Sequence, residues 1–163
     1  MRIGLISDTH SFIDPKWSEF FESCDEIWHA GDIGSLAVLD HLKSLKPVRA
    51  VFGNIDNKEI RQELPEILNF EIEGLKVLMI HIGGYPGKYD RLAKQKIQEY
   101  TPRLFICGHS HILRVIYDPK HQMLTMNPGA AGTHGFHKIK TIIRFTISDG
   151  RVKDAEVVEL GLK

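Results

Sequence analysis

The sequence has no excess of either charge, few cysteines and no long apolar run. Its 21 Lys and Arg residues balance its 21 Asp and Glu residues, so it has no electrostatic reason to coat nucleic acid. No apolar run approaches the roughly 18 residues of a membrane-spanning helix, and the first residues lack a signal-peptide pattern. Cys24 and Cys107 show no metal-binding or disulfide spacing. We therefore expect a cytoplasmic protein that neither binds membranes nor coats nucleic acid.

The first third of the chain alternates between apolar runs and helical patterns, and we expect a single domain over residues 1–163. Residues 2–6, 26–30 and 48–52 are nearly continuous apolar runs, typical of buried parallel strands. A helix is expected through residues 15–23, with Asp14 as its N-cap. A second is expected between Ser35, as its cap, and Pro47. This order predicts a parallel sheet with right-handed crossovers.

The rest of the chain predicts two more such strands and an antiparallel tail. Residues 75–80 and 103–107 are apolar, and between them we expect a glycine-rich loop (82–87) and a helix (89–100). Strands are expected at 115–117, 123–126, 141–148 and 152–160, the last two joined by the hairpin signal Asp149-Gly150. The fold class expected is α/β, with two stacked sheets and helices outside.

Seven residues with metal-ligating side chains follow the five apolar runs of the predicted sheets. They are Asp8, His10, Asp32, Asn54, His81, His109 and His111. Because ligands of open α/β sheets gather at the carboxyl ends of strands, we expect one site at one sheet edge. Asp8 and His10 would point the same way in an extended chain and grip one ion, as would His109 and His111.

The ligand set combines oxygen and nitrogen donors and contains no sulfur. Such donors suit Mn²⁺, Fe or Zn²⁺ better than Ca²⁺ or Cu(I). Seven ligands are too many for one tetrahedral ion but suit two ions that share a carboxylate. A pair of ions can generate hydroxide near neutral pH and clamp a phosphoryl group. We expect two divalent ions per chain, Mn first, with Zn, Fe or Ni as alternatives.

The ordered motifs Asp-x-His, Gly-Asp, Gly-Asn-x-Asp, His and Gly-His-x-His resemble those of the calcineurin-like metallophosphoesterases. With the short length and Asn127-Pro128-Gly129, the chain resembles the small bacterial and archaeal phosphodiesterase branch. The resemblance implies a four-layer α/β/β/α fold and a phosphodiesterase using a metal-bridging hydroxide for in-line attack on a small phosphoester. It implies Asp32, Asn54 and His109 as catalytic residues. One ion would be held by Asp8, His10, Asp32 and His111, the other by Asp32, Asn54, His81 and His109.

The sequence departs from the family pattern at the position of the usual proton donor. Many members carry a histidine between the Asn and Asp of Gly-Asn-x-Asp, but this chain has Ile55, which cannot donate a proton. The role of Asp56 is therefore open. His134 or His137 is a candidate replacement donor, and Gly83 and Lys88 are candidate substrate contacts. We favour an exposed surface position for His134, His137 and Lys88. A tight strand-to-helix loop would explain Gly83 as well as a substrate contact does.

His29 and Cys107 lie within predicted strands. We expect His29 to pack beneath the site and Cys107 to be a buried, unreactive thiol.

One alternative function is a phosphomonoesterase of the same mechanism. The other is a non-catalytic protein-interaction scaffold, because a retromer scaffold subunit shares the family's fold. The sequence does not determine the oligomeric state.

Overall fold

The computed structural model describes all 163 residues, and its main body is a pair of five-stranded sheets. The first sheet has the strand order β12-β11-β1-β2-β3. Strands β1 (Arg2–Ile6), β2 (Glu26–His29) and β3 (Val48–Ala50) are parallel. The hairpin of β11 (Ile139–Ser148) and β12 (Arg151–Leu162) pairs antiparallel with β1. The hairpin predicted at Asp149-Gly150 is confirmed.

The second sheet has the strand order β4-β5-β8-β10-β9. Its three central strands, β5 (Leu75–Ile80), β8 (Leu104–Ile106) and β10 (Met123–Pro128), are parallel. The two outer strands, β4 (Ile67–Ile72) and β9 (Leu113–Asp118), run antiparallel to their neighbours. The tail is therefore antiparallel only in part, because β10 joins this sheet beside β8.

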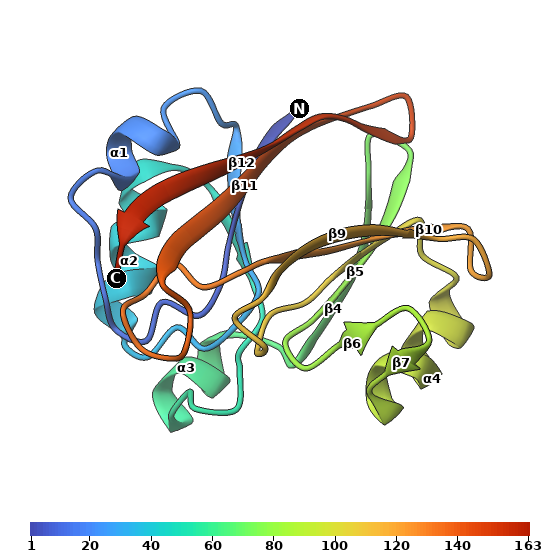
Figure 1. The fold of residues 1–163 in the computed structure, drawn as a ribbon, viewed down its shortest axis with the longest axis horizontal. Coiled ribbons are helices and arrows are strands. Elements are labelled where there is room, and N and C mark those ends of the chain that lie inside the picture. Colours follow the sequence, from blue (N-terminus) through green and yellow to red (C-terminus); the bar gives the residue numbers. More distant parts are fainter.

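Helices cover the outer faces of both sheets (Figure 1). The first sheet carries α1 (Trp17–Phe20), α2 (Leu36–Leu45) and α3 (Lys58–Glu63), and the second carries α4 (Arg91–Tyr100). The expected α/β fold of two sheets flanked by helices is confirmed. No helix has both the length and the apolar character needed to cross a membrane.

Alternation along the central strands builds three apolar layers. In β1, Ile3 and Leu5 enter the core between the sheets, whereas Ile6 packs beneath the helices. In β5, Met79 enters the core between the sheets, whereas Leu78 packs against α4. Strands apolar on both faces are buried on both faces, as parallel strands in α/β proteins are.

The first predicted helix is much shorter than expected. Only Trp17–Phe20 are helical, and turns flank them. Asp14 is not the N-cap, because Lys16 occupies that position. The Asp14 carboxylate accepts a hydrogen bond from the Lys16 N–H at 3.0 Å and pairs with Lys140 at 3.3 Å. A buried ion pair to β11 thus holds Asp14 in place of a helix cap. Ser35 does occupy the N-cap of α2, but its side chain makes no capping hydrogen bond.

Several elements differ from those expected from the sequence. The helix expected at residues 89–100 is α4, and it begins at Arg91 because Asp90 caps it by accepting the Leu92 N–H at 3.1 Å. The expected loop 82–87 instead forms a small hairpin with the residues that follow, β6 (Gly84–Tyr85) and β7 (Lys88–Tyr89). Helix α3 and strand β4 were not predicted. Both are short or half-exposed, so their apolar periodicity is weak.

The expectation of one sheet edge was also wrong. The ligand-bearing strands are divided between the sheets, with β1, β2 and β3 in the first and β5 and β8 in the second. The antiparallel strand β4 begins the second sheet, which packs its apolar face on the first. The site therefore lies where the carboxyl ends of two stacked sheets meet.

Candidate metal centre

The loops that follow β1 and β2 are joined by backbone hydrogen bonds. The N–H of Asp8 donates to the carbonyl of Gly31 at 3.0 Å, and the N–H of His10 donates to the carbonyl of Asp32 at 3.1 Å. At Gly31 a Cβ atom would lie 2.6 Å from Nδ1 of His81, so only glycine lets the second sheet approach this closely. These contacts set Asp8, His10 and Asp32 side by side.

The loops that follow β5 and β8 in the second sheet are hydrogen-bonded to each other and to Asp8. The N–H of Gly108 donates to the carbonyl of His81 at 2.9 Å, which aligns the ends of β5 and β8. The N–H of His109 donates to Oδ2 of Asp8 at 3.2 Å, and this bond crosses from one sheet to the other. Asn127 supports the loop by donating from Nδ2 to the Gly108 carbonyl at 2.8 Å. The two sheets are thus fixed relative to each other at their ligand-bearing ends.

The backbone at the site is left-handed at five of the seven ligand positions. The φ angles are 54° at Asp8, 45° at His10, 56° at Asp32, 69° at His109 and 58° at His111. The extended conformation expected for both Asp-x-His and His-x-His is therefore wrong. Non-glycine residues adopt such angles at a cost of order 1–3 kcal/mol each, and they cluster at functional sites.

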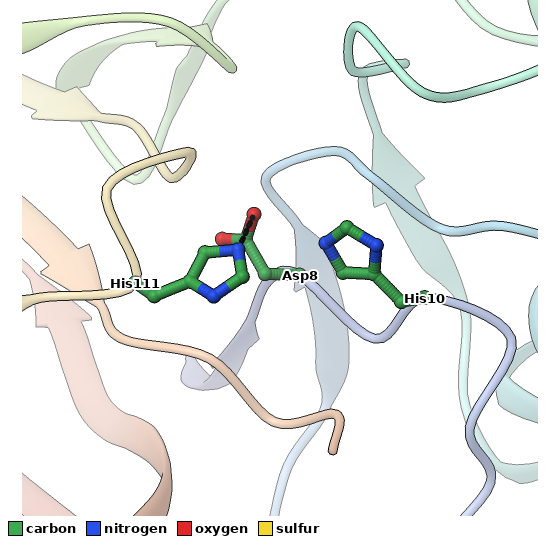
Figure 2. Close-up of side chains that lie close together, drawn as sticks. All are labelled: Asp8, His10 and His111. Atoms are coloured by element: carbon green, nitrogen blue, oxygen red, sulfur yellow. Dashed lines mark ion pairs between the residues drawn. The ribbon is translucent and has the colours of Figure 1, made fainter. Parts of the chain in front are cut away.

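The first cluster of ligand-type side chains contains Asp8, His10 and His111 (Figure 2). One ligand atom of each lies within 4.8 Å of the others. Asp8 stands between the two imidazoles, and its Oδ1 is 3.3 Å from Nε2 of His111. The loops after β1 and β8 supply this cluster together.

The second cluster contains Asp32, His81 and His109, again within 4.8 Å of one another. Nε2 of His81 lies 3.1 Å from Oδ1 of Asp32. Oδ1 of Asn54 lies 3.0 Å from Nδ1 of His109, which places this amide at the solvent side of the cluster. His109 and His111 therefore belong to different clusters and do not share one.

Asp32 lies between the two clusters. Its Oδ1 faces His81, and its Oδ2 is 3.6 Å from Nε2 of His10 in the first cluster. A second link is the 3.9 Å separation between Oδ1 of Asp8 and Nε2 of His81. The structure thus brings all seven predicted ligands together, with one carboxylate positioned toward both groups.

The electrostatics of the site follow from burying carboxylates beside imidazoles. Burial by itself would lower the pKa of His81, but the carboxylates of Asp32 and Asp8 outweigh burial and raise it. Burial would raise the pKa of Asp32, yet His81 and the Ile55 N–H keep it below its usual range. At His10 burial outweighs the nearby carboxylates and lowers the pKa. The site therefore favours the ionised form of the Asp32 carboxylate.

Three ligand atoms at the centre are buried without hydrogen-bond partners: Oδ1 of Asp8, Nε2 of His10 and Nε2 of His81. The His81 and Asp32 atoms are close, but their arrangement does not meet hydrogen-bond geometry. Buried polar atoms normally have partners, and an exception calls for a water or ion at that position. Carboxylate and imidazole atoms that converge unpaired fit a divalent cation of the Mn, Fe or Zn class.

Contacts behind the ligands fix their orientation. Nδ1 of His81 lies 2.7 Å from the carbonyl of Ala30, which leaves Nε2 directed into the site. Ser7 donates from Oγ to Oδ2 of Asp8 at 2.7 Å. His29 is fully buried, with Nε2 at 3.0 Å from Oγ1 of Thr9. The expectation that His29 packs beneath the site is confirmed.

Asp56, whose role the sequence left open, organises the loops around Asp32. Its buried carboxylate accepts hydrogen bonds from the N–H groups of Ile33 at 3.2 Å, Gly34 at 2.8 Å and Gly53 at 2.7 Å. Ile33 and Gly34 directly follow Asp32 in the sequence, and Gly53 directly precedes Asn54. An Asp two residues after an Asn in a glycine-led loop was a usable signal, because aspartate readily accepts local backbone N–H groups.

A pocket of about 350 Å³ opens beside His109. The predicted contacts Gly83 and Lys88 line it, together with Tyr85, Ile112 and other residues that the sequence did not indicate. Gly83 is needed for packing, because a Cβ there would lie 2.4 Å from Cβ of Cys107.

The other substrate candidates lie at the first cluster. The ring centroid of His134 is 4.8 Å from that of His10, and the ring of His137 is 5.4 Å from that of His111. Nε2 of His137 is occupied, 2.8 Å from the carbonyl of Gly132, whereas His134 is exposed. Both histidines stand at the first cluster, whereas Ile55 stands beside the second, where its N–H contacts Asp32.

Comparisons with known proteins agree with this geometry. The calcineurin-like phosphoesterase superfamily domain matches residues 1–150. A probable metallophosphoesterase of Methanothermobacter thermautotrophicus is 32% identical over 99% of this chain and 94% of its own length. The structure of an archaeal phosphodiesterase has a TM-score of 0.74 at 24% identity, covering 98% of this chain and 100% of that one. Vps29 of Chaetomium thermophilum has a TM-score of 0.76 at 15% identity, covering 100% of both chains. The chain therefore belongs to the calcineurin-like phosphoesterase superfamily, in its branch of small archaeal and bacterial metallophosphoesterases.

Proposed function

We propose that this protein is a phosphodiesterase that depends on two divalent metal ions. The observation that carries the proposal is the pair of ligand clusters with the Asp32 carboxylate between them and unpaired, buried ligand atoms at their centre. Asp8, His10, Asp32 and His111 would hold one ion. Asp32, Asn54, His81 and His109 would hold the other. The donor set suits Mn, with Zn, Fe or Ni as alternatives.

When bound, two such ions supply hydroxide near neutral pH and neutralise charge on the phosphoryl group. The protein's own part is to hold the ligands in position and to keep the Asp32 carboxylate ionised. Asp32 is held for this by the Ile55 N–H, which donates to its Oδ1 at 3.1 Å. His109 and Asn54 stand at the exposed side of the second cluster, where a phosphoester reaches them from solvent.

Protonation of the leaving oxygen needs a donor other than Ile55. We assign this role to His134, because it is exposed and packs on His10, whereas one nitrogen of His137 is already used. Replacing His134 with Gln should lower the rate more for alkyl than for nitrophenyl leaving groups, because only basic leaving oxygens need a proton. Equal losses on both substrates would count against this role.

A diester is favoured over a monoester by the scarcity of cationic side chains. Lys88 and Arg114 line the pocket beside His109, and no other lysine or arginine does. Arg61, near Asn54, is occupied by the carbonyls of Asp56, Gly53 and Asn54. A diester carries one fewer ionised oxygen than a monoester and needs fewer cations. Rates on p-nitrophenyl phosphate and bis(p-nitrophenyl) phosphate, compared with the same metal, test this preference.

The central experiment removes one ligand at a time. Asp32→Ala and His81→Ala should abolish Mn²⁺-dependent hydrolysis of bis(p-nitrophenyl) phosphate and lower the metal content. Asp40→Ala, an exposed aspartate on α2, is the matched control and should retain both. Unchanged turnover in the two ligand variants would refute the proposal. Thermal unfolding of each variant separates loss of the site from loss of the fold.

A non-catalytic interaction scaffold is the second candidate, favoured by the fold likeness to Vps29. A purified protein with two bound ions and no hydrolysis of any phosphoester would support it. We also place the protein in the cytoplasm, because both cysteines are free and buried and would be stable in a reducing compartment.

A further inference from the structure

Large apolar side chains are exposed around the pocket beside His109. Tyr85 is 40% exposed and Ile112 is 54% exposed, and both line this pocket with Ile82, which is 37% exposed. They come from three separate segments: the loop after β5, the β6–β7 hairpin and the loop before β9. Exposed apolar residues that gather at one concave site mark binding surfaces, whereas single scattered ones do not.

The wall that carries Tyr85 is rigid. The turn between β6 and β7 is Pro86-Gly87, and Gly87 has φ of 87°, as the third position of a type II turn requires. At Gly84, φ is 77° and a Cβ would lie 2.3 Å from the carbonyl oxygen of Lys88. Arg114 on β9 places its guanidinium 4.3 Å from the centroid of the Tyr85 ring. The ring is therefore held in place before any ligand arrives.

The charges around the pocket suit an anion attached to an apolar group. Lys88 and Arg114 form no ion pair in the protein, so both remain available to a phosphate. The single carboxylate of the lining, Asp90, already accepts the Leu92 N–H as the cap of α4. His109 links the pocket to the second ligand cluster, so a phosphoryl group held there would direct one ester substituent into the pocket.

We propose that this pocket binds a planar aromatic ester group and makes the site selective for aryl phosphoesters over small alkyl ones. The inference rests on the proposed function, because it takes the phosphoryl group to lie at the two clusters. Tyr85 and Ile112 contact the ring, and Arg114 positions Tyr85. The methyl group of a methyl phosphoester would leave most of this pocket unfilled. Burying an aryl group there should favour its binding by about tenfold or more.

Calorimetry on the Mn²⁺-loaded protein tests this with phenyl phosphate, methyl phosphate and inorganic phosphate. In the wild type, phenyl phosphate should bind about tenfold tighter than methyl phosphate. Tyr85→Ala and Ile112→Ala should each reduce this ratio at least about threefold and leave the affinity for inorganic phosphate unchanged. Tyr85→Phe, which keeps the ring, should preserve the ratio. Tyr117→Ala removes an exposed tyrosine of β9 outside the pocket and is the matched control.

The two proposals fail in different ways. A wild-type ratio near one, or a ratio unchanged in both Tyr85→Ala and Ile112→Ala, overturns the aromatic pocket even if the protein hydrolyses phosphodiesters. Binding of phenyl phosphate with no binding of inorganic phosphate would keep the pocket and count against the phosphoryl site. Because Tyr85 and Ile112 lie on different segments, a folding defect in one variant leaves the other decisive. If no ligand binds at all, both proposals fall.

Discussion

Replacing Asp56 with Ala should damage both the stability and the metal affinity of this protein. The side chain is 4% exposed, and its carboxylate accepts three backbone N–H groups, from Ile33, Gly34 and Gly53. Alanine offers no acceptor, so the donors lose their partner inside the loops that flank Asp32.

The size of the effect follows from the number of hydrogen bonds. Each hydrogen bond to a charged group contributes about 1.5–3 kcal/mol, and contributions within one network do not add fully. Gly34 is half-buried, so water can compensate part of its loss. We expect the free energy of unfolding to fall by about 3–5 kcal/mol. Asp56→Asn keeps the shape and one acceptor oxygen, and it should lose about half as much.

Metal affinity should fall as well, because the freed N–H groups lie beside Asp32 and Asn54. Loss of a residue that supports metal ligands typically costs about 10–100-fold in affinity. Urea unfolding of the metal-free protein gives the stability, and Mn²⁺ titration by calorimetry gives the affinity. Asp40→Ala, at an exposed position of α2, should change stability by less than about 0.5 kcal/mol.

One result would show this reasoning to be wrong. If Asp56→Ala loses less than about 1 kcal/mol and binds Mn²⁺ like the wild type, the three hydrogen bonds do not organise the site. A loss of stability without loss of affinity would limit Asp56 to a structural role.

Three further outcomes are expected. Burial raises the pKa of the Cys107 thiol to about 12. Cys107 should therefore not react with a disulfide reagent in the native protein at pH 8, but it should react in urea. A fast reaction of Cys107 in the native protein would contradict this. The carboxylates of Asp32 and Asp8 outweigh burial and raise the pKa of His81, and a metal needs the neutral imidazole. As pH falls, apparent Mn²⁺ affinity should therefore begin to decline above the ordinary histidine pKa of about 6.5. An affinity that stays flat between pH 8 and 6 would exclude this competition. At Gly4, a Cβ would lie 2.4 Å from Cδ1 of the buried Phe21. Gly4→Ala should therefore lower the free energy of unfolding by about 1–3 kcal/mol, measured in urea. An unchanged urea midpoint would show that Phe21 can move aside.

The relation between the site and the fold explains why the metal centre tolerates costly backbone angles. Five ligands have positive φ, yet the loops that carry them hydrogen-bond to one another, and Asp56 holds the loop that carries Asp32. Strained residues persist where the surrounding structure over-determines them. The apolar layer between the two sheets provides that rigidity directly behind the ligands.

Much of the fold and the identity of the ligand residues could be predicted from the sequence alone. Continuous apolar runs determined the central strands, because strands buried on both faces need apolar residues at every position. Asp149-Gly150 determined the final hairpin through its positive φ angles of 53° and 68°. Ligand-type residues at strand ends and their order along the chain determined the family, which the comparisons confirmed.

Tertiary structure alone decided how these pieces meet. Residues 15–23 look helical locally, but the pairing of Asp14 with Lys140, far away in the sequence, helps hold the chain in a turn. The division into two sheets depends on which apolar faces bury each other, and no local pattern records that choice. The anchoring role of Asp56, the left-handed ligand backbones and the pocket of Tyr85 and Ile112 likewise arise from contacts between distant segments. Local sequence specifies periodicity and turn chemistry, whereas the arrangement of the site is set by long-range packing of the two sheets.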